Sequence, residues 1–199
     1  MKIIGLTGSI AMGKTTVAGF FRQAGVSVFS ADEMVHKLYD SEKTCSLIKH
    51  IFPDVIENGK INRVKLSEIL INDDKKLQKL EKIIHPLVRT KEEEFVETAR
   101  QQGEKLVVLD IPLLFETKSE KRVDFVVVVS APLTMQKERA MIRPNMSEEK
   151  FAFISSKQMS DEKKRERADF VIDTGKDLEN TRQQVFCLIK KLLKNEDNA

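Results

Sequence analysis

Residues Gly8 to Thr15 combine glycines, a lysine and a threonine in an order suited to binding phosphate. The run GSIAMGKT matches the pattern G-x-x-x-x-G-K-[ST] and directly follows a strand-like opening, MKII. Glycine permits a backbone that turns several N–H groups toward one anion, and a helix starting near Gly13 directs its positive end to the same place. Lys14 would reach the β- and γ-phosphates, and the Thr15 hydroxyl would bind Mg²⁺. The motif therefore predicts a nucleoside triphosphate site.

Two carboxylates stand at the ends of apolar runs, where parallel sheets bind their ligands. Asp32 follows VFSA, and we expect it to be the general base that deprotonates an acceptor hydroxyl. The alternative is that Asp32 is the N-cap of the helix EMVHKLY. Asp110 ends LVVLD and has the form of a Walker B carboxylate that holds Mg²⁺, with a cap or loop residue as the alternative.

Basic and apolar side chains near these carboxylates suggest contacts with phosphate and with an acceptor. Arg139 and Arg143 have helical i, i+4 spacing, so we expect them on one helix face, gripping phosphate oxygens. A solvated face with partners such as Glu138 is the alternative. The segment IPLLF, which contains Leu113, lines an apolar pocket or is plain core. Gln158 and the Lys/Arg run after it are expected on the surface without a role.

The elements that position these residues are predicted from hydrophobic patterning. Five short runs lack polar alternation, which is typical of parallel strands covered on both faces: Lys2 to Thr7, Val26 to Ser30, Leu106 to Asp110, Phe125 to Ser130 and Asp169 to Asp173. Helical patterns separate them, so we predict a doubly wound α/β fold with a parallel sheet. A kinase built on this phosphate loop would have the three-layer P-loop kinase fold, with the strands in the order 2-3-1-4-5.

We expect a single domain with two helical excursions. The core comprises 1–31, 104–132 and 168–199, the helical acceptor-binding insertion 32–103, and the helical lid 133–167. An amphipathic helix from Leu178 to Leu193 closes the fold, and the last residues, NEDNA, are expected to fray.

Composition narrows the functional classes. Charged residues make up 33% and the net charge is only +3, with no basic arm for nucleic acid and no membrane patch. No apolar run approaches the ~20 residues that span a bilayer, and MKIIGLTGS does not resemble a signal peptide. Cys45 and Cys187 are expected to be reduced and at least partly buried, as in a cytoplasmic protein. A guanine-reading N/T-K-x-D motif is absent, because TKSE and TKEE lack the aspartate. A small-molecule kinase remains.

Several segments, in one order along nearly the whole chain, resemble the dephospho-coenzyme A kinase family. They are GLTGSIAMGKTTVAGFF, SADEMVH, NGKINRVKL, LEKIIHPLV, LDIPLLFE, ERAMIR with KQMS, and ADFVIDTG. The resemblance implies transfer of a phosphoryl group from ATP to the ribose 3′-hydroxyl of dephospho-coenzyme A, with Mg²⁺.

The resemblance also implies roles for individual residues. Asp32 would be the base, Lys14 and Arg139 would be catalytic, and Arg143 would contact the nucleotide. Arg63, His85 and Leu113 would belong to the acceptor side. For His85 the alternative is that HP interrupts a helical run and Pro86 starts a new helix. The loop residues around the phosphates would be Gly8, Ala11, Met12, Gly13, Lys14, Thr15 and Thr16.

The sequence departs from the family pattern at four positions. Ser9 and Ala11 replace usual loop glycines, so we expect binding with a stiffer loop. Ser30 replaces the first aspartate of D-A-D, and Thr174 replaces an asparagine, which puts an adenine contact there in doubt. A nucleoside or nucleoside monophosphate kinase and a non-catalytic nucleotide-binding module remain alternatives. The expected oligomeric state is a monomer or a weak homo-oligomer.

Overall fold

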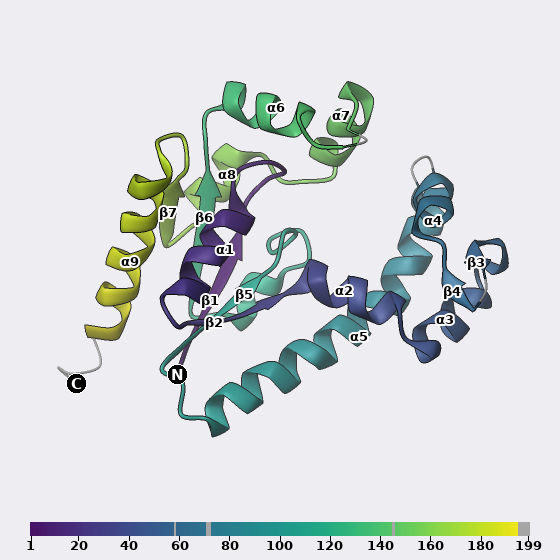
Figure 1. Ribbon diagram of the computed structural model, residues 1–199, viewed down its shortest axis with the longest axis horizontal. Coiled ribbons are helices and arrows are strands. Elements are labelled where there is room, and N and C mark those ends of the chain that lie inside the picture. Colours follow the sequence, from purple (N-terminus) through teal and green to yellow (C-terminus); the bar gives the residue numbers. More distant parts are fainter. Residues whose placement is uncertain (58, 71–72, 145, 195–199) are drawn as a thin grey trace. The chain divides into compact units, whose positions relative to one another are not determined.

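A computed structural model describes residues 1–57, 59–70, 73–144 and 146–194, which form the elements labelled in Figure 1. The chain divides into two compact units. The first comprises Met1–Phe29 and Thr98–Ala199, and the second comprises Ser30–Glu97.

A five-stranded sheet organises the first unit. Its order is β2-β5-β1-β6-β7, and β1 pairs in parallel with both β5 and β6, as β6 does with β7. Since β5, β6 and β7 are the third, fourth and fifth predicted strands, the predicted order 2-3-1-4-5 is confirmed. Two strands begin one residue later than expected. The bounds are β1 (Lys2–Thr7), β2 (Ser27–Ser30), β5 (Leu106–Asp110), β6 (Phe125–Ser130) and β7 (Phe170–Asp173).

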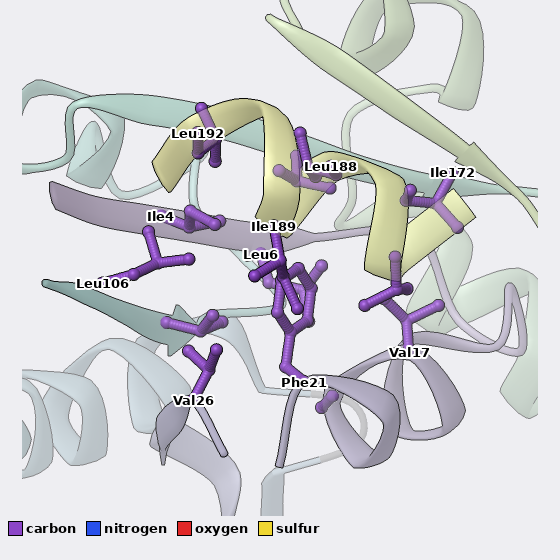
Figure 2. Packing of buried hydrophobic residues seen from close by; sticks show 14 of the residues in the cluster. Ile4, Leu6, Val17, Phe21, Val26, Leu106, Ile172, Leu188, Ile189 and Leu192 are labelled. Carbon is purple, nitrogen blue, oxygen red and sulfur yellow. The ribbon is translucent and has the colours of Figure 1, made fainter. Parts of the chain in front are cut away.

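Helices α1 (Lys14–Gln23) and α9 (Leu178–Lys194) cover one face of this sheet. Phe21 of α1 gathers with Leu6 of β1 and Ile189 of α9 in one buried cluster (Figure 2). The predicted closing helix is therefore present, one residue longer than expected. The residues NEDNA, predicted to fray, lie outside the described residues.

The segment predicted as a lid forms three short helices in the first unit: α6 (Leu133–Met141), α7 (Glu148–Ser156) and α8 (Asp161–Glu166). The short η2 helix (Ser119–Arg122) precedes β6. Because α6 ends at Met141, Arg143 lies beyond it. The prediction that Arg139 and Arg143 share a helix face is therefore wrong.

The second unit is mainly helical and has its own buried core. Its elements are α2 (Ala31–Tyr39), α3 (Glu42–Lys49), η1 (Pro53–Val55), the antiparallel pair β3 (Ile56–Glu57) and β4 (Lys60–Ile61), α4 (Arg63–Leu70) and α5 (Asp74–Gln101) up to Glu97. Ile48 and Val55 are fully buried at its centre. Helix α5 runs through Pro86 without a break, so the alternative that Pro86 starts a new helix is wrong.

Both cysteines are free thiols, but only Cys45 is buried. The expectation of a buried or semi-buried position is wrong for Cys187, which lies on the exposed side of α9. Within the described ranges, no helix combines the length and the apolar character needed to cross a membrane.

Candidate active site

The predicted phosphate-binding segment connects β1 to α1 in the first unit. Gly13, which precedes α1, has a φ of 88°, a left-handed conformation that favours glycine. A Cβ on Gly8 would lie 2.7 Å from the Val129 carbonyl oxygen, so no side chain fits there. Gly13 is therefore suited to its position by its backbone conformation, and Gly8 by the lack of space for a side chain.

Ala11 lies between these glycines and also has a positive φ, 61°. Its side chain is buried, as is that of Met12. The Met12 N–H donates to the Ser9 carbonyl at 3.2 Å, and the Met12 sulfur accepts from the Ala131 N–H at the same distance. A non-glycine residue thus occupies the left-handed position in a tightly enclosed loop.

Lys14 and Asp110 come together beside this loop. The Lys14 ammonium lies 2.5 Å from one Asp110 carboxylate oxygen, and their side chains are only 14% and 7% exposed. The pairing of β1 with β5 aligns Leu6 with Asp110, which brings the two segments together. Thr15 and Thr16, in the first turn of α1, are exposed. The loop thus has a partly buried cation, a buried carboxylate and accessible hydroxyls at its helical end.

Arg139 contacts the loop through Thr174. The Arg139 guanidinium donates to the Thr174 hydroxyl at 3.1 Å and to its carbonyl at 2.8 Å, and the same hydroxyl donates to the Met12 carbonyl at 2.8 Å. Arg139 is partly buried, so a solvated helix face does not describe it. Arg143 is exposed. Thr174, where the sequence left an adenine contact in doubt, is a buried link between Arg139 and the loop.

Two glutamines contact the loop, and neither contact was predicted from the sequence. Gln158 was expected on the surface without a role, yet its side-chain oxygen accepts from the Ile10 N–H at 2.9 Å. The Gln136 side chain donates to the Ile10 carbonyl at 2.8 Å. Both contacts join residues more than 120 positions apart, and no local pattern reports such a contact.

Lys164 also contradicts the expectation of a surface position for the Lys/Arg run. Its side chain is fully buried, 3.1 Å from a Glu116 carboxylate oxygen, and it donates to the Pro112 carbonyl at 3.2 Å. Burial lowers the pKa of the Lys164 ammonium below 10.5, and the carboxylates of Glu116 and Asp161 oppose that shift. Nothing in DEKKRER distinguishes this lysine from its neighbours.

The loop that follows β5 contains Pro112 and Glu116, the two partners of Lys164, and both have a further hydrogen-bond partner. The Thr7 hydroxyl donates to the Pro112 carbonyl at 2.9 Å, and Glu116 accepts from the Met159 N–H at 2.6 Å. Leu113 is partly buried, whereas most of IPLLF is core: Ile111, Leu114 and Phe115. The segment that follows Asp110 at the end of β5 is therefore held by one residue that precedes it in the sequence and by one that follows it.

The remaining predicted residues lie in the second unit. Asp32 is exposed in the first turn of α2, but the N-cap is Ser30, whose hydroxyl accepts from the Glu33 N–H at 3.3 Å. The alternative that Asp32 caps this helix is therefore wrong.

Arg63 and His85 are also on the surface of this unit. Arg63 lies 2.7 Å from the His36 ring nitrogen Nδ1 and donates to Asp40 at 3.1 Å. His85 is exposed on α5. Arg63 is thus held in place by two neighbours while 43% of its side chain stays accessible.

A phosphate loop between β1 and α1, with a partly buried lysine–aspartate pair and a sheet of this order, defines a P-loop kinase. A family model described as dephospho-CoA kinase matches residues 2–180. The chain belongs to the dephospho-CoA kinase family.

Individual relatives support this assignment over nearly the full length. The chain is 79% identical to a dephospho-CoA kinase of Bartonella henselae, over 98% of this chain and all of the relative. A crystal structure from Thermus thermophilus superposes with a TM-score of 0.81 at 32% identity, covering 96% of this chain and 97% of that one. A dephospho-CoA kinase structure from Campylobacter jejuni has a TM-score of 0.67 at 26% identity, covering 96% and 97%. The family thus favours a dephospho-CoA kinase over the two alternatives, a nucleoside or nucleoside monophosphate kinase and a non-catalytic nucleotide-binding module.

Proposed function

We propose that this chain transfers the γ-phosphoryl group of ATP to the ribose 3′-hydroxyl of dephospho-coenzyme A, forming coenzyme A and ADP. The observation that supports it most directly is the Lys14–Asp110 pair beside the phosphate loop. A lysine there can neutralise phosphate oxygens, and a carboxylate beside it suits a metal-bound nucleotide.

The nucleotide would bind in the first unit. The backbone from Ala11 to Thr16 would wrap the phosphates, with Gly8 and Gly13 allowing the turn and Met12 filling the space beneath. Arg139 would stabilise charge on the transferring group, and Arg143, which is exposed, would contact the nucleotide.

The residues fit a magnesium ion. Hydroxyl and carboxylate oxygens are the ligands that Mg²⁺ prefers, and Thr15 and Asp110 supply one of each near the phosphates. Among the described residues, no three His, Cys, Asp or Glu side chains are grouped so that they could hold a metal ion. When bound, Mg²⁺ would neutralise charge on the phosphates.

Leu113 would contact the acceptor. Asp32 would take the proton of the 3′-hydroxyl as its oxygen attacks the γ-phosphorus, and the bond to the β–γ bridging oxygen breaks, so ADP leaves with that electron pair. Arg63 and His85 would bind the acceptor. Closure of the segment 133–167 would exclude water, the competing acceptor.

Replacing the proposed base separates binding from chemistry. We expect Asp32→Asn to retain the ATP dissociation constant and to lower kcat by about 10²–10⁴-fold, the usual contribution of general base catalysis. A coupled assay for ADP, with ATP, Mg²⁺ and dephospho-coenzyme A, measures kcat, and calorimetry measures ATP binding. Transfer at the parent rate by Asp32→Asn would show that Asp32 is not the base.

Two controls complete this experiment. Glu33→Gln changes the adjacent carboxylate, in the same helical turn, and should keep the parent rate. Lys14→Ala should lose nucleotide binding instead. Phosphorylation of nucleosides in place of dephospho-coenzyme A would reject the proposed acceptor.

A further inference from the structure

The phosphate loop is held by side chains that the proposed chemistry does not use. Gln136 donates to the Ile10 carbonyl, and Gln158 accepts from the Ile10 N–H. Gln136 is only 5% exposed and belongs to α6, while Gln158 is partly buried and follows α7. Both peptide groups of Ile10 are thus bonded to glutamines from the segment 133–167.

These two bonds determine how the neighbouring peptide groups point. In a planar trans peptide the C=O and the N–H point in opposite directions. The bond from Gln136 to the Ile10 carbonyl therefore turns the Ala11 N–H the other way. The bond from the Ile10 N–H to Gln158 likewise turns the Ser9 carbonyl away from Gln158, and that carbonyl accepts from the Met12 N–H at 3.2 Å.

The next peptide groups along the loop are bonded as well. The Met12 N–H holds the Ala11–Met12 peptide, and the Thr174 hydroxyl holds the Met12 carbonyl. Ala11 lies in the middle of this series with a φ of 61°, a conformation that an alanine does not adopt readily by itself. The loop conformation is therefore imposed from outside the loop.

We propose that Gln136 and Gln158 are positioning residues that hold Ala11 in the left-handed conformation used for phosphate binding. The inference rests on the proposed placement of ATP at this loop. Where glycine stands in place of Ala11, the backbone reaches the same φ without a steric penalty, and the loop needs less support. In this chain, Gln136 and Gln158 stabilise the left-handed conformation that a third loop glycine would adopt without support.

The test compares two backgrounds that differ only at position 11. Gln136→Met and Gln158→Met each keep the side-chain length but remove the hydrogen bond to Ile10. In the parent background each should weaken ATP binding by ~10-fold, the effect of about one lost hydrogen bond. In the Ala11→Gly background the same substitutions should weaken it by about threefold or less, because glycine tolerates the conformation unaided.

Calorimetric titration with ATP and Mg²⁺ measures the dissociation constants, so the experiment does not depend on the identity of the acceptor. The KM for dephospho-coenzyme A should stay unchanged in the single variants. If the proposed acceptor is wrong, that KM cannot be measured while the ATP titrations still decide this inference. An equal weakening in both backgrounds, or no weakening in the parent, overturns it. Should Gln136→Met fail to fold, Gln158→Met at a partly exposed position gives the same comparison.

Discussion

At the scale of single residues, Ala11 shows how the chain can do without a loop glycine. A left-handed alanine costs about 1–2 kcal/mol, whereas a hydrogen bond contributes a net of about 0.5–1.5 kcal/mol. The two glutamine bonds to Ile10 are therefore together large enough to offset the cost at Ala11.

Lys164 is the other residue whose role follows from burial. We expect Lys164→Met to lower the free energy of unfolding at neutral pH by about 3 kcal/mol, because it leaves Glu116 without its cation in a largely buried place. Urea denaturation measures this. The double variant Lys164→Met with Glu116→Gln should recover part of the loss, and equal losses in the single and double variants would contradict the pairing.

The stability should also respond to pH through Lys164. The lowered pKa means that the folded chain releases this proton at a lower pH than the unfolded chain, whose lysine titrates near 10.5. Between those two values the unfolded chain binds more protons, so the free energy of unfolding rises with pH. The parent should gain stability relative to Lys164→Met as pH approaches 10.5, in urea titrations at several pH values. A relative loss would have the wrong sign.

At the scale of elements, the start of helix α2 contains one residue with a structural role and another with a proposed catalytic role. Ser30 caps the helix and Asp32 lies in its first turn. The N-cap bond is local and is formed by a residue type that favours this position. The residue that is unusual for the family pattern thus has a structural explanation, while Asp32 stays free of the capping role.

Removing this cap should affect stability and turnover together. We expect Ser30→Ala to lower the free energy of unfolding by about 1 kcal/mol and to reduce kcat, because fraying of the first turn displaces Asp32. ATP binding should not change. Ser41→Ala removes the equivalent cap of α3, where the Ser41 hydroxyl accepts from the Thr44 N–H at 3.2 Å, and should cost similar stability without reducing kcat. An equal fall of kcat in both variants would contradict a specific role for α2.

At the scale of the whole molecule, each compact unit has a core of its own. Ile4 belongs to the cluster between the sheet and α1 and α9, and Ile48 belongs to the cluster of the second unit. Both side chains are fully buried. A substitution that destabilises one core should therefore affect first the functional residues of the same unit.

A matched pair of substitutions tests this division. Ile48→Ala and Ile4→Ala should each cost about 2–5 kcal/mol of unfolding free energy. We expect Ile48→Ala to raise the KM for dephospho-coenzyme A and leave ATP affinity nearly unchanged, and Ile4→Ala to weaken ATP binding. Steady-state kinetics and calorimetry measure the two effects. A loss of ATP affinity in Ile48→Ala equal to that in Ile4→Ala would show that the units do not act separately.

Much of the fold was predictable because its signals are local. Val126 to Val129 form a continuous apolar run since a central parallel strand is buried on both faces. The phosphate loop was predictable because glycine, lysine and threonine must stand at set spacings in one strand–turn–helix. Helix ends were less predictable, as the end of α6 at Met141 and the uninterrupted course of α5 through Pro86 show. A proline removes one backbone hydrogen bond from a helix, and the long helix α5 remains continuous without that bond.

The amino-acid sequence alone determined the strands and the loop chemistry, because short-range spacing is enough to specify a turn and a buried strand, and the strand order was expected from the kinase class that the loop indicates. Only the tertiary structure decided that Gln158 reaches Ile10, that Thr174 joins Arg139 to Met12, and that one lysine of a charged run is buried beside Glu116. These contacts form between residues remote in sequence. The type of a polar residue does not reveal whether its side chain faces water or a buried partner. Its role is therefore set by the elements that pack around it.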